Sequence, residues 1–403
     1  MNDLASVARS SPMMARIVEL GAEMRAIRQD IHRHPELAYE EKRTAALVAA
    51  RLRAWGIEVH EGIGGTGVVG VLHAGKSTRA IGLRADMDAL PIHEASGLPY
   101  ESVHQGCAHS CGHDGHTAML LCAARYLSES RRFDGRIHLI FQPAEEGKAG
   151  ARAMIEDGLF EKFPCDEVYA LHNWPALPAG TVATRPGAIM AAADRVEIRV
   201  RARGGHAAQP HLSADAILCA AQIVTAAHTL VARRIDPNAT AVLSLTRIAG
   251  GASHNVMPAE VSITGTVRSF DPAVQDRIES ALRELVEGTA RAAGCTATLE
   301  YHRYYPATLN DPDCARHALD AAKALLGEAT LAEAPAFTSE DFAFMLNAVP
   351  GAYIWLGQGS AVRGAQLHTP GYDFNDDVLP VGAALLATIA ERRLEIGSPP
   401  ARG

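Results

Sequence analysis

The sequence predicts an α/β protein with a mostly parallel sheet flanked by helices, into which a ferredoxin-like α+β satellite domain is inserted. In the first part of the chain, short apolar segments typical of buried strands alternate with amphipathic helical segments. From Asp194 onward, apolar and polar residues alternate strictly, which indicates a sheet with one face in water. An α/β pattern returns over residues 310–393. We therefore expect a catalytic domain formed by residues 1–188 and 303–403, and a satellite domain formed by residues 189–302.

The elements of the first part follow from hydrophobic spacing. Apolar residues recur at helical intervals over residues 13–31, 40–55 and 116–127, and Gly56 closes the second of these helices. Short apolar segments predict strands at 66–72, 80–85, 136–141 and 166–171. Helices between parallel strands imply helices on both faces of the sheet.

The satellite domain is predicted from the order of its elements. Strand, helix, strand, strand, helix and strand follow one another at 194–201, 214–231, 241–248, 259–267, 272–293 and 296–302. This order is typical of the ferredoxin-like fold, in which two helices cover one face of the sheet. The other face is left free for a partner.

Composition excludes several classes of function. The 403 residues, with 48% hydrophobic and 21% charged residues, are typical of a globular enzyme of two domains. A net charge of −8 argues against nucleic acid or an anionic membrane as a partner. No apolar run reaches the roughly 18–20 residues that a membrane span needs, and residues 1–19 lack the apolar core of a signal peptide. Seven scattered cysteines fit a reducing compartment, so we expect a cytoplasmic location.

The segment from Cys111 to His116 predicts a metal site. It combines a thiol, two imidazoles and a carboxylate with two glycines, and divalent metals of intermediate softness take sulfur and nitrogen ligands. A loop of surface histidines is the alternative.

Further polar residues follow predicted strands. Glu145 and Glu146 come after one strand and His172 after another, while His368 lies late in the chain. Two adjacent carboxylates are expensive to bury unless a cation compensates them. Ligands of open α/β sheets gather at the carboxyl ends of strands. An acidic turn and structural histidines remain the alternative interpretation.

The number of candidates favours two metals over one. A structural zinc site needs four ligands, whereas Cys111, His113, Glu146, His172 and His368 supply five. A two-metal hydrolytic site, with ions about 3.5–4 Å apart around an activated water, fits better. Glu145 is then left to act as general base and acid. Cys111 is the preferred bridge, because a thiolate can bind two metals and a neutral imidazole cannot easily do so.

Three aspartates are candidates for supporting roles. Asp86 and Asp88 lie just past a strand with their side chains on one face, where they could bind metal or orient ligand histidines. We favour the orienting role for Asp88, and Asp114 is another candidate for it. Capping of a helix or turn is the alternative for all three.

The satellite domain carries a candidate site of its own. Two glycines precede His206, which could stabilise a developing oxyanion; a turn with exposed histidines is the alternative. Residues 250–257, together with Arg268, could bind a substrate carboxylate.

Several long motifs together resemble the amidohydrolase branch of the aminoacylase and carboxypeptidase di-metal peptidase family, which includes hippurate hydrolases, auxin-amino-acid conjugate hydrolases and N-acetyl-diaminopimelate deacetylases. They lie at 32–36, 83–91, 111–116, 142–146, 171–174, 204–211, 338–342 and 367–370. The resemblance implies a di-zinc peptidase-like fold, the five metal ligands given above and Glu145 as catalytic base. It also implies substrate contacts from Asn255 and Arg268, and a His206 that reaches the active site, in related dimers from the partner subunit.

The resemblance also implies a cofactor, a substrate and an assembly. We expect two divalent ions per subunit, manganese or zinc in the first place and cobalt or nickel otherwise. The expected reaction releases an amino acid from an N-acyl conjugate, and a homodimer or homotetramer forms through the satellite domain.

Three alternative functions remain open. A dipeptidase or carboxypeptidase of the same family would share the whole site. A cysteine-nucleophile amidase would use Cys111 with a nearby histidine and would be indifferent to chelators. A zinc-stabilised binding protein would give Glu145 no role.

Overall fold

The structure, a computed structural model, describes residues 11–359 and 366–396. Contacts divide the chain into two compact units. Unit 1 comprises Met1–Ile189, Leu309–Ala334 and Asp341–Gly403, and unit 2 comprises Met190–Thr308 and Pro335–Glu340. Unit 2 contains residues 190–302 of the satellite segment expected at 189–302. It also extends to Thr308 and includes Pro335–Glu340, which were expected in the catalytic domain.

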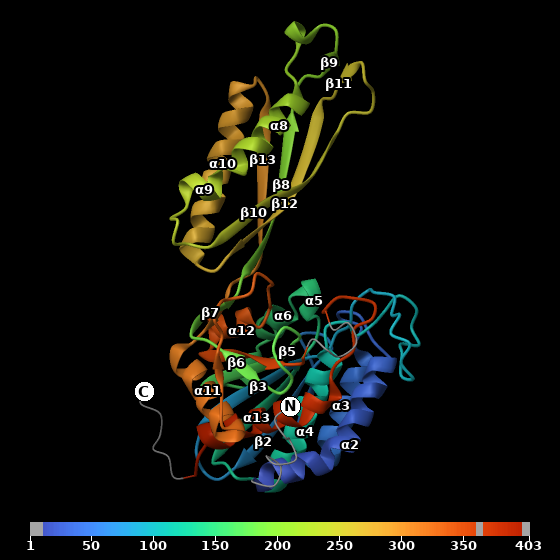
Figure 1. Cartoon of the computed structure of the whole chain (residues 1–403), viewed down its shortest axis with the longest axis vertical. Coiled ribbons are helices and arrows are strands. Elements are labelled where there is room, and N and C mark those ends of the chain that lie inside the picture. The colour runs from blue at the N-terminus through green and yellow to red at the C-terminus, as the bar shows by residue number, and fades with distance from the viewer. Residues whose placement is uncertain (1–10, 360–365, 397–403) are drawn as a thin grey trace. The chain divides into compact units, whose positions relative to one another are not determined.

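Unit 1 is built on an eight-stranded mixed sheet in the order β1-β2-β4-β3-β5-β16-β6-β15. Figure 1 labels β2, β3, β5 and β6 of this sheet among the helices of the unit. Four neighbouring strands at its centre run parallel: β4 (Gly135–Gln142), β3 (Ala80–Asp86), β5 (Glu167–Trp174) and β16 (Gly351–Gly357). The outer strands are β1 (Glu58–Ile63), β2 (Gly67–Ala74), β6 (Val182–Thr184) and β15 (Thr330–Leu331). The expected α/β class is confirmed, and the sheet is mixed because β1, β2 and β6 pair antiparallel with a neighbour.

Helices cover this sheet. The longer ones are α2 (Pro12–Arg33), α3 (Lys42–Ala54), α4 (His113–Ser130), α11 (Pro312–Leu326) and α13 (Leu379–Arg393). The shorter ones are α5 (Glu145–Lys148), α6 (Gly150–Glu156), α7 (Leu159–Lys162), α12 (Ala343–Ala348) and the 3₁₀ helix η2 (Asp376–Val378). The helices α2, α4 and α13 pack on one another, and their buried apolar faces form one core with the sheet. None of the described helices has the length and apolar content needed to cross a bilayer.

The start of α4 departs from the expected position in a way that matters for the site. The helix begins at His113, three residues before the expected start at 116, because Gly112 takes a left-handed conformation with φ 96° directly before it. Glycine adopts this conformation without the steric cost that a Cβ would impose. His113 therefore lies in the first turn of α4.

Unit 2 contains a four-stranded antiparallel sheet in the order β10-β12-β8-β13. Its strands are β8 (Ala192–Arg201), β10 (Ala241–Gly250), β12 (Glu260–Ser269) and β13 (Thr296–Tyr305). Its helices are α8 (Ala216–Ala227), α9 (Leu230–Arg234), α10 (Pro272–Ala292) and the 3₁₀ helix η1 (Pro210–Leu212). The helices α8 and α10 pack on the sheet and on each other, which is the expected ferredoxin-like arrangement.

Two further pairs of short strands complete the structure. β9 (Gly205–His206) pairs with β11 (Val256–Met257), and β7 (Gly187–Met190) pairs with β14 (Thr308–Asn310). The first pair belongs wholly to unit 2, whereas the second contains two of the four points where the chain passes between the units.

Candidate metal centre

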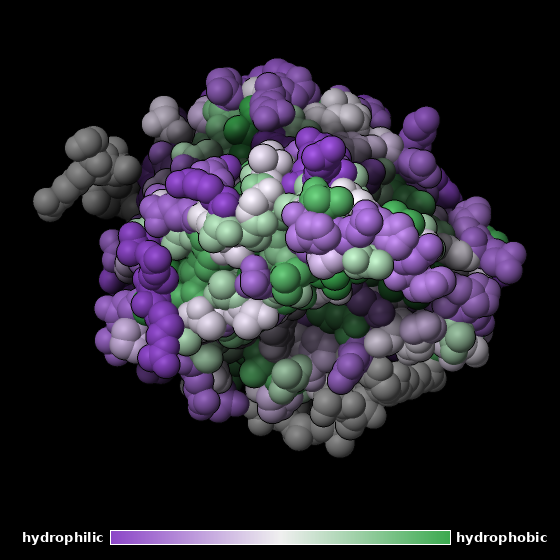
Figure 2. Space-filling view, turned by 90° about the horizontal axis from the view of Figure 1, so that it is seen from above, coloured by the Kyte–Doolittle hydropathy of each residue, from purple (hydrophilic) through white to green (hydrophobic). Residues whose placement is uncertain are grey.

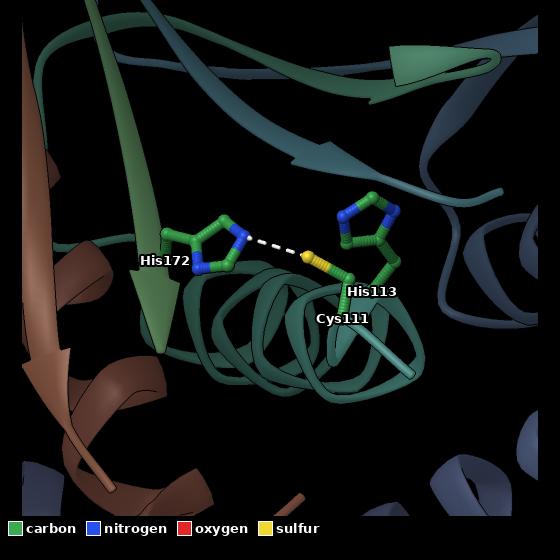
Figure 3. A group of neighbouring side chains, drawn as sticks. All are labelled: Cys111, His113 and His172. Carbon is green, nitrogen blue, oxygen red and sulfur yellow. Dashed lines mark hydrogen bonds between the residues drawn. The ribbon is translucent and has the colours of Figure 1, made fainter. Parts of the chain in front are cut away.

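Side chains from three strand ends meet the first turn of α4 in unit 1. Figure 3 shows His172 of β5 pointing at the sulfur of Cys111, with the ring of His113 on the other side of that sulfur. The His172 Nε2 atom lies 3.5 Å from the Cys111 Sγ atom. The Nδ1 atom of His172 donates to the Asn173 carbonyl at 2.7 Å, which leaves Nε2 as an acceptor with its lone pair toward the thiol.

Cys111 belongs to two groups of potential ligands. In one group, its sulfur lies within 4.8 Å of a nitrogen of His113 and a nitrogen of His172. In the other, it lies within the same distance of an oxygen of Glu146 and a nitrogen of His368. All five expected ligands are thus brought together, and the thiol is the member that the two groups share.

Two of the potential ligand atoms have no hydrogen-bond partner in the described part of the chain and are spaced as if to bind a metal ion. The His113 Nε2 and Glu146 Oε1 atoms lie 4.0 Å apart, and both are buried without a hydrogen-bond partner among the described residues. Glu146 Oε1 also lies 3.1 Å from the Nε2 atom of His368. Buried polar atoms are rarely left unpaired, so such a gap between a nitrogen and an oxygen is what a bound metal would fill.

The charges and burial around Cys111 also favour the binding of a cation. Burial, together with the charges of Glu146 and Glu145, raises the pKa of the Cys111 thiol well above its usual value. Burial lowers the pKa of His172 well below its usual value, so that imidazole is neutral and ready to bind metal. A thiolate forms here only when positive charge offsets the carboxylates.

Asp88 links the ligand segments. Its Oδ1 atom accepts from His113 Nδ1 at 3.2 Å and from the backbone N–H of Glu145 at 3.0 Å, while Oδ2 accepts from the N–H of Glu146 at 2.9 Å. Burial opposes protonation of His113, but the charge of Asp86 and the bond to Asp88 raise its pKa to about 10, so a metal at Nε2 would have to displace a proton. Asp88 thus aims His113 Nε2 at the cluster, the orienting role expected from the sequence.

Asp86 and Asp114 differ from each other in what they contact. Asp86 accepts from His116 Nδ1 at 2.6 Å and lies 3.7 Å from His113 Nε2, which keeps both a supporting role and a ligand role open. Asp114 does not orient an expected ligand. It accepts from His32 Nδ1 at 2.8 Å and from Arg28 at 3.3 Å, because its place in the first turn of α4 turns it toward α2.

Comparison with known protein families matches residues 82–392 to the family described as Peptidase family M20/M25/M40. The chain belongs to this family. It is 40% identical to a hippurate hydrolase of Campylobacter jejuni, over 95% of this chain and 100% of the relative. It is 36% identical to an N-acetyldiaminopimelate deacetylase of Leuconostoc mesenteroides, over 93% and 98%. These relatives support a hydrolytic enzyme that acts on amides.

A solved structure supports the same assignment. The YXEP protein of Bacillus subtilis, described as a dinuclear metal binding peptidase from the M20 family, superposes with a TM-score of 0.82 at 31% identity. The match covers 93% of this chain and 99% of that one. Cys111, which the two ligand groups share, therefore lies in a fold that, in this neighbour, binds two metals.

In this M20/M25/M40 chain, two glycines of the α4 segment allow a close approach of the chain after His368. A Cβ on Gly112 would lie 2.4 Å from the Asn173 Oδ1 atom and 2.6 Å from the Tyr372 hydroxyl. A Cβ on Gly115 would lie 2.4 Å from the ring of Phe374. Both glycines are needed because the segment that follows His368 packs directly on the segment that carries Cys111 and His113.

Several residues that hold the site together were not predicted from the sequence. His116 makes bonds of 2.6 Å through Nδ1 to Asp86 and through Nε2 to Asn173, so both of its ring nitrogens are occupied by protein. Arg28, which is fully buried, pairs with Asp114 and also with Asp373 at 2.8 Å. The motif at 32–36 pointed to this region, but nothing in the spacing gave Arg28 a partner.

Unit 2 holds the three remaining candidates for contact with the substrate. His206 pairs with Val256 in the β9–β11 ladder, so Asn255 lies beside it, and both are exposed. Arg268 pairs with Ala193 near the other end of β12 and donates to the Val267 carbonyl at 3.0 Å. Within this unit, the fold brings His206 and Asn255 together and keeps Arg268 apart from them.

Proposed function

We propose that this chain hydrolyses the amide bond of N-acyl amino acids and releases a carboxylic acid and a free amino acid. One observation carries the proposal: a buried carboxylate, Glu145, lies beside two potential ligand groups that share one thiol. The names of the two curated relatives, a hippurate hydrolase and an N-acetyldiaminopimelate deacetylase, support the substrate class.

The proposed ligand sets follow the two groups. Cys111, His113 and His172 would hold one divalent ion, and Cys111, Glu146 and His368 would hold the other, with manganese or zinc preferred over cobalt or nickel. When bound, such ions polarise the scissile carbonyl and make water more acidic. Glu145 takes a proton from the attacking water and passes it to the departing amine, which leaves as a neutral amino group.

His206, Asn255 and Arg268 are proposed to contact the substrate. The His206 Nδ1 atom accepts from the Ala208 N–H at 3.1 Å, which places the ring proton on Nε2. That N–H can donate to the oxyanion that develops at the carbonyl carbon. Asn255 and Arg268 offer an amide and a guanidinium, and a guanidinium binds the carboxylate of an amino acid in a bidentate manner.

We also propose a homodimer or homotetramer that forms through unit 2. Figure 2 shows green residues among purple ones on the face seen from above. The exposed large apolar side chains of this unit include Leu212, Ile217, Leu218, Ile248 and Val256. Contact between copies would remove this apolar surface from water. A cytoplasmic location is part of the same proposal, supported by seven free cysteines.

A cysteine-nucleophile amidase is the second candidate, favoured by the 3.5 Å contact between Cys111 and His172. The charges argue against it, because an activated thiol needs a lowered pKa and the pKa of Cys111 is raised. A dipeptidase or carboxypeptidase would share every metal ligand and differ only in its substrate.

Chelation and metal add-back test the proposal. The purified protein is assayed on N-benzoylglycine, N-acetyl amino acids and dipeptides before chelation, after chelation and after the return of each metal. We expect turnover of the acyl amino acids that is lost on chelation and restored by metal. Turnover that survives complete metal removal would contradict the proposal, and a preference for dipeptides would favour the peptidase alternative.

A further inference from the structure

The turn that carries Glu145 has an unusual backbone. Ala144, which precedes it, has φ 55°, a left-handed conformation that costs a residue with a Cβ free energy. Such a turn persists only when its surroundings hold it. The groups that hold residues 144–146 in place therefore bear on the position of the proposed base.

Three successive backbone N–H groups of this turn donate to two carboxylates. The N–H groups of Glu145 and Glu146 donate to Asp88, as described above. The N–H of Ala144 donates to the Oε1 atom of Glu41 at 2.8 Å. Glu41 therefore holds the strained residue itself, immediately before the proposed catalytic base.

The side chain of Glu41 binds the Ala144 turn and does not cap the helix α3 that follows Glu41. It directly precedes α3, yet its side chain makes no capping bond to that helix. Its Oε1 atom also accepts from the Tyr39 N–H at 3.0 Å, and its Oε2 atom accepts from the Thr66 hydroxyl at 2.5 Å. The side chain is fully buried, and no cationic side chain in the described part of the chain forms an ion pair with it. Burial of a carboxylate without a cation is costly, so the N–H and O–H donors around Glu41 are what keep it there.

We propose that Glu41 is a positioning residue for Glu145: it fixes the left-handed turn at Ala144 and thereby directs the Glu145 carboxylate toward the ligand cluster. The inference rests on the proposed role of Glu145 as general base. Asp88 acts on the same turn but also holds His113, so Glu41 is the member whose removal leaves every contact of the proposed metal ligands intact.

The test compares Glu41→Met with Glu36→Met, because methionine has a similar size but lacks the oxygen that accepts the Ala144 N–H. Glu36 is the matched control, because its carboxylate also accepts two backbone N–H bonds, from Arg43 and Thr44, each at 2.8 Å. Those bonds hold the start of α3 and not the turn. Misplacement of a catalytic group by about 1 Å can cost about 10²-fold in rate. We expect kcat to fall by about that factor in Glu41→Met, with KM and metal content unchanged, whereas Glu36→Met keeps its kcat.

Two further variants separate positioning from general damage. Combining Glu41→Met with Glu145→Gln should lower kcat no further than Glu145→Gln alone, because Glu41 acts through Glu145. Adding Ala144→Gly to Glu41→Met should restore part of the kcat, since glycine takes a positive φ without strain. If Glu41→Met does not fold, Thr66→Val removes one donor to Glu41 and should show the same split between kcat and KM, at a smaller size.

The outcomes also distinguish this inference from the proposed function. If Glu145→Gln retains turnover with metal bound, the proposed base is wrong and the inference fails with it. If Glu145→Gln is inactive while Glu41→Met keeps a normal kcat, only the inference is overturned. An additional loss in the double variant, beyond that of Glu145→Gln, would likewise overturn it.

Discussion

Replacing Gly115 with alanine should destabilise the protein, although the same change usually stabilises a helix. The added Cβ would lie 2.4, 2.5 and 2.6 Å from three ring carbons of Phe374, a side chain that is 1% exposed. Restoring a contact of 3.4 Å requires the ring or the helix to move by about 1.0 Å (3.4 − 2.4). Overpacking of this kind costs about 1–3 kcal/mol, which exceeds the gain of about 0.5–1 kcal/mol from replacing a helical glycine.

Gly21 provides the matched control for this prediction. It lies within α2, and a Cβ there would meet nothing within 4 Å. Urea denaturation in the presence of a chelator should show a lower free energy of unfolding for Gly115→Ala and a slightly higher one for Gly21→Ala. Gly115→Ala should also bind metal more weakly, since Gly115 follows His113 by two residues. Equal or greater stability of Gly115→Ala, with normal metal affinity, would refute the packing argument.

Three further predictions concern the base, the satellite histidine and pH. Glu145→Gln should keep its metal and fold while turnover falls by about 10²–10⁴-fold; near-normal turnover with metal bound would show that another group is the base. His206→Ala should lose about 10²–10³-fold in kcat with metal retained, and mixing it with Glu145→Gln protomers should restore some activity if His206 serves the partner subunit. No recovery after verified subunit exchange would mean that His206 acts within its own chain or not at all. Burial opposes protonation of His32, but its bonds to Asp114 and Glu94 raise its pKa to about 9. Its protonation therefore stabilises the fold fully below about pH 6.5, and this contribution is lost as pH rises through about 9. The difference in free energy of unfolding between the wild type and His32→Asn should shrink over that range by roughly 3 kcal/mol, and a difference independent of pH would contradict the raised pKa.

The sequence could predict which side chains gather around Cys111, because the direction of parallel strands fixes where their ends lie. Glu146 and His172 follow or end parallel strands, and the carboxyl ends of neighbouring parallel strands share one edge of a sheet. The chemistry of a thiol and imidazoles within a few residues then pointed to metal. Sequence reasoning also found the order of elements in unit 2, because strict alternation in β8 is typical of a sheet with one exposed face.

What the sequence did not show depends on contacts between distant segments. Asp114 was expected to orient a metal ligand, and its side chain instead faces Arg28 and His32 on α2. A shift of one position around a helix turns a side chain by about 100°, so adjacent His113 and Asp114 serve different partners. Glu41 gave no signal at all, because it falls in the first turn of the helix predicted at 40–55, where an acidic residue is favoured by the helix dipole and indicates no distant partner. Its bond to Ala144 spans 103 residues and follows from tertiary packing alone.

The metal content of Cys111→Ala tests the central claim most directly. Cys111 contributes to both ligand groups, whereas His172 and His368 each contribute to one. After dialysis against a defined low metal concentration, the wild type should retain two ions per chain and Cys111→Ala should retain almost none. His172→Ala and His368→Ala should each retain about one ion, and Cys111→Asp should recover part of the loss with an altered metal preference, because a carboxylate can also bridge two ions. Two ions retained by an inactive Cys111→Ala would contradict the shared-ligand arrangement and favour a nucleophilic thiol.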